Sequence, residues 1–220
     1  MLISEIFSSC EGEGLRTGYL ATFIRTYGCN LRCTYCDSMY AVDEKRDLFG
    51  KNTYKNMELD EIVKECKKLN NKRITLTGGE PLIQKNIASL LGTLKGYGFE
   101  INIETNGAVP LDAFVEIPVM LTMDWKSPYS GMRDKMIEKN LDLLREWDVL
   151  KFVVASKEDL DDMKEIILNH KLNCHIFVSP VFGKIEPVDI VEYMKENNLQ
   201  QARLQLQIHK LIWDKDKRGV

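Results

Sequence analysis

Strand-like and helix-like segments alternate along most of this chain, and this alternation restricts the possible fold more than any other feature. Short apolar runs such as RITLT (73–77), EINIET (100–105) and LKFVVA (150–155) are typical of buried strands. Longer segments with helical spacing separate them, such as MELDEIVKECKKL (57–69). Repeated strand–helix units predict a parallel sheet covered by helices. We therefore expect an α/β fold whose binding residues lie at the C-terminal ends of the strands.

The rest of the chain continues the same pattern. Ser156 begins a capping-box pattern, with Asp159 at the third helical position. The segment 40–56 is polar, and we expect a loop there with at most a short helix. The six or seven strand–helix units predict an open doubly wound sheet or a partial barrel. Further strands are expected at 20–27, 119–124, 175–179 and 203–207, and further helices at 83–98, 135–147, 156–170 and 187–198.

Bulk composition excludes several classes of protein. The 220 residues suffice for a single domain over 1–220, and 44% of them are hydrophobic. The net charge of -3 argues against a sequence-independent grip on nucleic acid. No apolar run is long enough to span a membrane, and the acidic N-terminus is unlike a signal peptide. We therefore expect a cytoplasmic protein, in which six cysteines are metal ligands or core thiols rather than disulfides.

Three of these cysteines fall within GCNLRCTYCDS (28–38), as Cys29, Cys33 and Cys36. Three thiolates can hold three irons of a four-iron four-sulfur cluster, leaving the fourth iron open to another ligand. The alternative is a three-cysteine zinc site completed by a distant histidine. Cys66 and Cys174 lie in apolar patterns and are expected in the core.

Two glycine-containing motifs follow strands. TLTGGEPL (75–82) ends a strand in two glycines, which allow the backbone to approach a ligand closely, and Pro81 suits the first turn of a helix. ETNG (104–107) lies at the end of the next strand. Each motif alone is also typical of an ordinary turn. Their order after the cysteines makes the combination more specific.

These motifs together resemble the radical S-adenosylmethionine (SAM) superfamily, whose signature is C-x-x-x-C-x-x-C. The order EIF…GEG…FIRTYGCN…CDS, with TGGEP, ETNG and the tail QLQIHKLIWDKDKRGV (205–220), resembles the 7-carboxy-7-deazaguanine synthase family. The resemblance implies a partial or modified (β/α) barrel of about six parallel strands. It also implies conversion of 6-carboxy-5,6,7,8-tetrahydropterin to 7-carboxy-7-deazaguanine. In this reaction a 5′-deoxyadenosyl radical removes a hydrogen atom, the ring contracts and ammonia is lost.

The resemblance also implies roles for individual residues. Cys29, Cys33 and Cys36 hold the 4Fe-4S cluster that cleaves SAM, Ser38 binds Mg2+, and Arg25 holds the substrate carboxylate through its planar fork. The residues expected to contact SAM are Tyr35, Cys36, Asp37, Gly79, Asp124, Trp125, Lys126, Ser179, Pro180, Val181 and Phe182. The other residues expected to line the pterin pocket are Cys10, Glu11, Gly12, Glu13, Thr77, Gln207, His209 and Val220.

The sequence departs from the family pattern at three positions. Glu11 stands where many relatives have glutamine, Ser38 where many have threonine, and DWK (124–126) where many have SPK. The resemblance further implies a homodimer and an external electron donor. Two alternatives remain open: a glycyl-radical activating enzyme, which shares the cysteine and glycine motifs, and a non-catalytic iron–sulfur or zinc protein.

Overall fold

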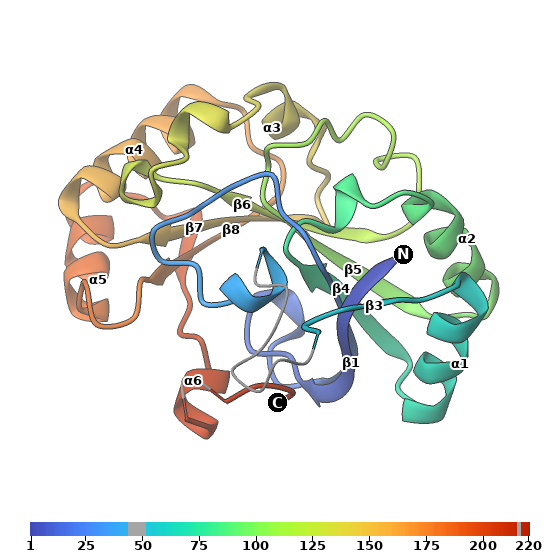
Figure 1. Ribbon diagram of the computed structural model, residues 1–220. Helices are drawn as coiled ribbons and strands as arrows, with labels where there is room; N and C mark the ends of the chain where they lie inside the picture. Colours follow the sequence, from blue (N-terminus) through green and yellow to red (C-terminus); the bar gives the residue numbers. More distant parts are fainter. Residues whose placement is uncertain (44–51, 215–216) are drawn as a thin grey trace.

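A computed structural model describes residues 1–43, 52–214 and 217–220, and one curled β-sheet forms its centre (Figure 1). Within these ranges nine strands pair in the order β3-β1-β2-β4-β5-β6-β7-β8-β9. The pairs from β2 to β9 are parallel, whereas β1 pairs antiparallel with β2 and β3. The strands are β1 (Leu2–Cys10), β2 (Leu20–Thr26), β3 (Lys55–Asn56), β4 (Arg73–Gly78), β5 (Glu100–Thr105), β6 (Met120–Trp125), β7 (Val149–Val154), β8 (His175–Pro180) and β9 (Ala202–Leu204).

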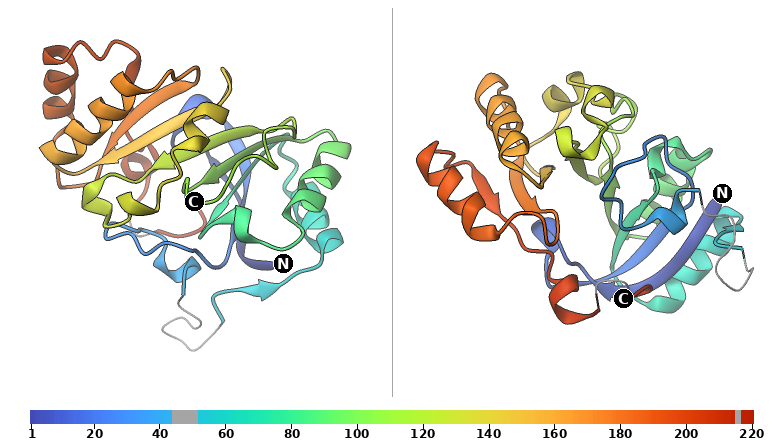
Figure 2. Two further views of the ribbon diagram at one scale, coloured as in Figure 1. Left: turned by 90° about the horizontal axis from the view of Figure 1, so that it is seen from above. Right: turned by 60° about the vertical axis from the view of Figure 1, so that its left-hand side comes forward.

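Helices cover the outer face of the sheet, whereas α6 lies apart from them near the C-terminus (Figures 1 and 2). Helices α1, α2, α4 and α5 contact the strands directly. Among the described helices, none combines the length and apolar character that a membrane span needs. The helices are α1 (Leu59–Leu69), α2 (Ile87–Gly96), α3 (Lys139–Leu143), α4 (Lys157–Asn169), α5 (Pro187–Glu196) and α6 (His209–Ile212).

The register of the strands separates an apolar outer face from a polar inner face. Side chains alternate between the faces along each strand, and directly paired residues of neighbouring strands share a face. The outer face forms the core under the helices and includes Ile24, Ile74, Leu76, Leu121 and Phe152, none of which is exposed to solvent. The paired residues of the inner face include Arg25, Thr75, Thr77, Asn102, Asp124 and Lys151.

This architecture confirms the expected partial barrel. Of the described strands, seven run parallel, and the cysteine loop follows the first of these, β2. The prediction missed β1, which pairs antiparallel with β2. Cys66 is fully buried in the core as expected, and Cys174 packs against the core with partial exposure. The expected loop over 40–56 lies partly outside the described residues.

Two helix predictions need correction. The helix expected over 135–147 is only α3, because Arg145 leaves the helical hydrogen-bond pattern: its backbone N–H donates to Asp148 (2.9 Å). Its guanidinium also donates to the carbonyls of Val115 and Val119. The helix expected from 83 begins at α2, after a short 3-10 turn.

The capping box expected at the start of α4 forms only in part. The Ser156 hydroxyl accepts a hydrogen bond from the backbone N–H of Asp159 (3.3 Å), as predicted. The Asp159 carboxylate instead accepts from the N–H groups of Ala155 (2.7 Å) and Tyr129 (2.9 Å). It therefore ties the start of α4 to the loop that follows β6.

Candidate active site

The cysteine loop leaves the C-terminal end of β2 and places all three thiols at half-buried positions. Cys29 accepts a hydrogen bond from the Leu31 N–H (3.4 Å), and Cys36 N–H donates to the Cys33 carbonyl (3.2 Å). In the described ranges, no group of three or more His, Cys, Asp or Glu side chains is placed as a single metal ion would require. Three thiolates on one loop can hold three irons of a four-iron cluster.

The glycine motif fits closely against the start of this loop. The Gly79 and Glu80 N–H groups donate to the carbonyls of Thr26 (3.0 Å) and Gly28 (2.8 Å). A Cβ at Gly79 would lie 2.0 Å from the Gly28 carbonyl oxygen. The second glycine is therefore needed to bring the ends of β2 and β4 together, in addition to any contact with a ligand.

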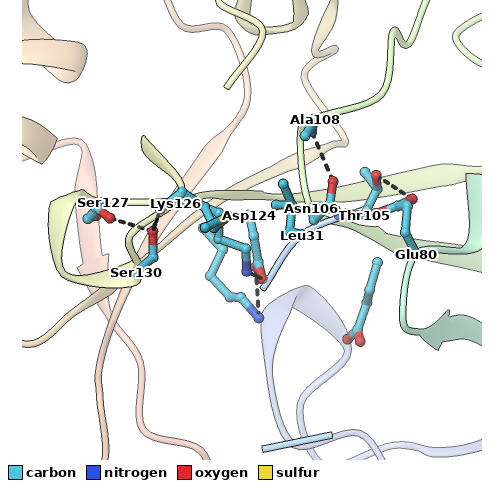
Figure 3. A network of polar contacts seen from close by, with 12 residues as sticks. Leu31, Glu80, Thr105, Asn106, Ala108, Asp124, Lys126, Ser127 and Ser130 are labelled. Atoms are coloured by element: carbon cyan, nitrogen blue, oxygen red, sulfur yellow. Dashed lines mark hydrogen bonds and ion pairs between the residues drawn. The ribbon is translucent and has the colours of Figure 1, made fainter. Parts of the chain in front are cut away.

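A chain of alternating charges crosses the inner face. Lys151 on β7 pairs with Glu13 (2.5 Å) and with Asp124 on β6 (3.0 Å), and Asp124 also pairs with Lys126 (2.7 Å; Figure 3). Burial acts to raise the pKa of Asp124, but the ammonium groups of Lys126 and Lys151 outweigh it and lower that pKa to about 2. For both lysines, burial opposes the charge but the carboxylates raise the pKa. The network is therefore fully ionised at neutral pH.

A second group of carboxylates, Glu11 and Glu104, lies on the same face. Glu11, 2% exposed, accepts a hydrogen bond from the Thr75 hydroxyl, and Thr77 donates to Glu104 (2.7 Å). Burial and then the neighbouring Glu104 carboxylate raise the pKa of Glu11 to about 7. Burial raises the pKa of Glu104 as well; Lys151 opposes this shift, and the Glu13 carboxylate adds to it. Such carboxylates suit a ligand that presents N–H donors, because each oxygen is an acceptor.

The perturbed Glu11 gives a testable pH dependence of stability. Its folded-state pKa of about 7 exceeds the ordinary value of 4.5, so between these pH values the folded protein binds more protons than the unfolded chain. Wild-type stability therefore falls as the pH rises through this window.

Glu11→Gln keeps an acceptor for Thr75 and has no proton to lose. We expect its free energy of unfolding to exceed that of wild type by about 1–3 kcal/mol at pH 8. Urea unfolding at pH 5 and pH 8 measures this, and an equal difference at both pH values would contradict it.

Arg25 lies at the edge of the inner face, at the C-terminal end of β2. Its Nε donates to Glu5 (2.7 Å), and the same carboxylate oxygen accepts from the Tyr40 hydroxyl (2.6 Å). The guanidinium also lies over the rings of Phe7 and Tyr40 (5.8 and 5.9 Å). These contacts hold the guanidinium in one orientation, as planar recognition of a carboxylate requires.

The segment after β9 closes the open side of the sheet against the loop between β1 and β2. The Gln205 side chain accepts from the Gly14 N–H (2.6 Å) and donates to the Gly14 carbonyl (3.3 Å), as a neighbouring strand would. Gln207 donates to Glu13. A Cβ at Gly12 would lie 2.0 Å from His209 Nδ1, so only glycine allows this approach. The predicted pterin residues from both segments therefore meet.

The side chains of the remaining predicted residues do not all lie at the site. Lys210 pairs with Asp37 (3.2 Å), which links α6 to the cysteine loop. The Trp125 ring lies on the outer face and donates to Asp162 (3.3 Å), so its side chain cannot border the site. Val220 has no hydrogen bond or ion pair recorded with the described residues, and its role stays a prediction. Cys10 ends β1, Ser179 and Pro180 end β8, and Val181 and Phe182 follow β8.

Sequence reasoning assigned no role to several residues of this face. Three of these residues are Lys151, Thr75 and Glu5. Each lies in a strand with its side chain on the inner face, and its contacts depend on which strand pairs with its own. Lys151 did carry a signal, because it is a lone charge within the apolar run VLKFVV (149–154). Gln205 carried no such signal, since its hydrogen-bond partner Gly14 is 191 residues away in the sequence.

Unpaired polar atoms test whether the site fits SAM. In the described part of the chain, five buried side chains have a polar atom without a hydrogen-bond partner. Three of these lie at the C-terminal side of the sheet: the Tyr35 hydroxyl in the cysteine loop, Ser127 Oγ after β6 and Ser179 Oγ in β8. Unpaired buried groups are costly, and a polar ligand would satisfy them. The three thiols and these hydroxyls therefore fit a cluster with a polar cofactor beside it.

Comparisons with known proteins agree with this geometry. The class that the fold and the cysteine loop define is the radical SAM superfamily, whose family model matches residues 23–146. A 7-carboxy-7-deazaguanine synthase of Clostridium acetobutylicum is 44% identical over 99% of this chain and 98% of its own. One of Methanospirillum hungatei is 38% identical over 96% of this chain and 85% of its own. The chain belongs to the 7-carboxy-7-deazaguanine synthase family.

A solved structure shares the fold. The crystal structure of QueE from Escherichia coli superposes with a TM-score of 0.72, covering 94% of this chain and 93% of that chain at 21% identity. Membership of the family makes the protein a radical SAM enzyme, a class that uses SAM and a 4Fe-4S cluster. The alternatives of a glycyl-radical activating enzyme and of a non-catalytic metal protein are not favoured.

Proposed function

We propose that this protein converts 6-carboxy-5,6,7,8-tetrahydropterin to 7-carboxy-7-deazaguanine, as a carbon–nitrogen lyase of queuosine and 7-deazapurine biosynthesis. The observation that carries the proposal is that the cysteine loop leaves the C-terminal end of β2, beside the inner face on which Glu11 and Glu104 lie with raised pKa values. Family membership supports the same reaction.

The three thiolates of Cys29, Cys33 and Cys36 hold the cluster. The C-terminal ends of β2, β4, β6 and β8, with the residues that follow them, surround SAM. When bound, the cluster and SAM supply one-electron chemistry that generates a 5′-deoxyadenosyl radical; the protein supplies orientation and charge. Tyr35, Lys126 and Ser179 offer hydroxyl and ammonium donors to the polar groups of SAM.

The inner face orients the pterin. Glu11, Glu13 and Glu104 accept hydrogen bonds from the N–H groups of the amino-pyrimidine ring. Arg25 holds the carboxylate at the other end of the substrate, and the closed segment around His209 excludes water. The high pKa of Glu11, about 7, lets this side chain either accept or donate, depending on its protonation.

Magnesium binds beside the cluster loop. The Ser38 hydroxyl lies next to the Asp37 carboxylate, to which it donates (3.0 Å). Oxygen ligands suit this hard ion, which retains waters and takes further oxygens from the substrate. In this proposal Ser38 is the protein ligand, as the resemblance to the family implies.

The protein functions in the cytoplasm as one radical SAM domain over 1–220. An external electron donor reduces the cluster, and two copies form a homodimer. The resemblance of the motifs to the family is the support for dimer formation.

Anaerobic conversion tests the proposal. The protein is loaded with iron and sulfide, then incubated with a strong reductant, SAM, Mg2+ and the pterin, and the products are identified by mass spectrometry. We expect 7-carboxy-7-deazaguanine with little net loss of SAM. Formation of 5′-deoxyadenosine without the deazapurine would retain the radical chemistry and contradict the substrate. Formation of neither product by protein with an intact cluster would contradict the enzyme activity.

A further inference from the structure

Asn106, in the ETNG motif after β5, lies against the first cysteine of the cluster loop. The side chain is 7% exposed. Its Nδ2 donates to Cys29 Sγ over 3.5 Å and to Asn30 Oδ1 over 2.8 Å. Both amide hydrogens are therefore used within the cysteine loop.

The direction of this amide is fixed by its other contacts. Asn106 Oδ1 accepts a hydrogen bond from the Ala108 N–H (2.9 Å; Figure 3). A flipped amide would place its NH2 group against that N–H and would lose the bond. The Asn106 backbone N–H donates to Glu80 (2.7 Å), and Glu80 also accepts from the Thr105 hydroxyl (2.9 Å). The donor is thus held toward the sulfur by the glycine motif.

A donor aimed at a ligand sulfur affects the electronics of an iron–sulfur cluster. Hydrogen bonds to the sulfurs are among the factors that set the reduction potential. They stabilise the extra negative charge of the reduced state, and partners of metal ligands also orient those ligands. A neutral amide is suited to this role because it adds no charge of its own.

We propose that Asn106 raises the reduction potential of the cluster by donating a hydrogen bond to Cys29. Asn106 is a positioning residue that acts through Cys29, and the proposal rests on the cluster assignment of the proposed function. Through Asn106, the ETNG and glycine motifs therefore influence how readily the cluster is reduced. This influence is independent of which substrate occupies the inner face.

The midpoint potential of the loaded cluster tests this inference, measured by redox titration with electron paramagnetic resonance detection. Asn106→Leu removes the donor, and we expect the reduction equilibrium to shift toward the oxidised cluster by about threefold to tenfold, the range of one hydrogen bond. A tenfold shift corresponds to about 59 mV for one electron. Asn106→Asp keeps the acceptor for Ala108 but replaces the donor by a charge, so a larger shift in the same direction is expected.

Asn30→Ala is the matched control, because it removes the other partner of the same amide and retains the bond to sulfur. We expect its midpoint potential to remain at the wild-type value. Equal potentials in wild type and both Asn106 variants would contradict the inference, as would a shift in Asn30→Ala as large as in Asn106→Leu. Failure of both Asn106 variants to hold iron would show a purely structural role and would also overturn it. Failure of the wild type to hold a four-iron cluster would instead overturn the proposed function.

Discussion

Replacing Arg25 with alanine is expected to abolish most pterin turnover while leaving the cluster and slow SAM cleavage intact. The Arg25 side chain is 17% exposed, and its guanidinium is oriented by Glu5, which also accepts from Tyr40. Truncating one partner of a buried, hydrogen-bonded charge pair costs about 2–5 kcal/mol, which corresponds to roughly 30-fold to several thousand-fold in kcat/KM. Product formation and 5′-deoxyadenosine formation are measured in parallel.

Two further variants separate this effect from a loss of stability. Arg25→Lys keeps the charge beside Glu5 but lacks the planar fork, so turnover is expected to remain low in a stable protein. Arg73→Ala is the control at the opposite end of the sheet, where Arg73 lies over the Tyr19 ring (4.0 Å). It is expected to turn over the pterin at nearly the wild-type rate. Wild-type turnover in Arg25→Ala would contradict the assigned role.

Replacing Lys151 with methionine is expected to cause the largest loss of stability. The side chain is 9% exposed and bridges Glu13 and Asp124, so its removal leaves buried carboxylates without their shared cation. Breaking a buried ion pair in this way costs about 3–5 kcal/mol. Urea unfolding at pH 7 measures the loss. Lys64→Met on the exposed face of α1 is the matched control, for which a change within about 0.5 kcal/mol is expected.

The pH dependence of this loss follows from the pKa shifts. In wild type Lys126 and Lys151 outweigh burial and lower the pKa of Asp124 to about 2. The pKa of Glu13 is lowered as well, because Lys151 and the hydrogen bond from Gln207 outweigh burial. Their ionised forms therefore stabilise the folded state above the ordinary carboxylate pKa, and this contribution is lost as the pH falls toward 2. The difference between wild type and Lys151→Met is expected to shrink below pH 4. A deficit that is constant with pH would contradict the charge-pairing explanation.

The sequence predicted best what depends on local spacing. The cysteine loop, the glycine motif and the buried strands β4, β5 and β7 appear within a residue or two of their predicted bounds. Residues whose roles depend on strand register were harder to assign. Asp124 and Trp125 are neighbours in the sequence, yet alternation sends one to the inner face and the other under α4.

The sequence did not predict the long-range contacts of the site, because they depend on how distant segments pack. The site closes because Gln205 substitutes for a neighbouring strand at Gly14, and because Gly12 leaves room for His209. Nothing in the local pattern of either segment predicts the other. Resemblance to a family did predict that Glu13 and His209 share a pocket, but the charge chain through Lys151 emerged only from the paired strands.

A crystal structure of the cluster-loaded protein with SAM and 6-carboxytetrahydropterin would test the central claim most directly. The account predicts that the pterin lies on the inner face, with its amino-pyrimidine edge within hydrogen-bond distance of Glu11, Glu13 or Glu104 and its carboxylate on Arg25. It also predicts SAM between the pterin and the three cysteines. A pterin bound away from the inner face, or an inner face filled by another ligand, would contradict the account.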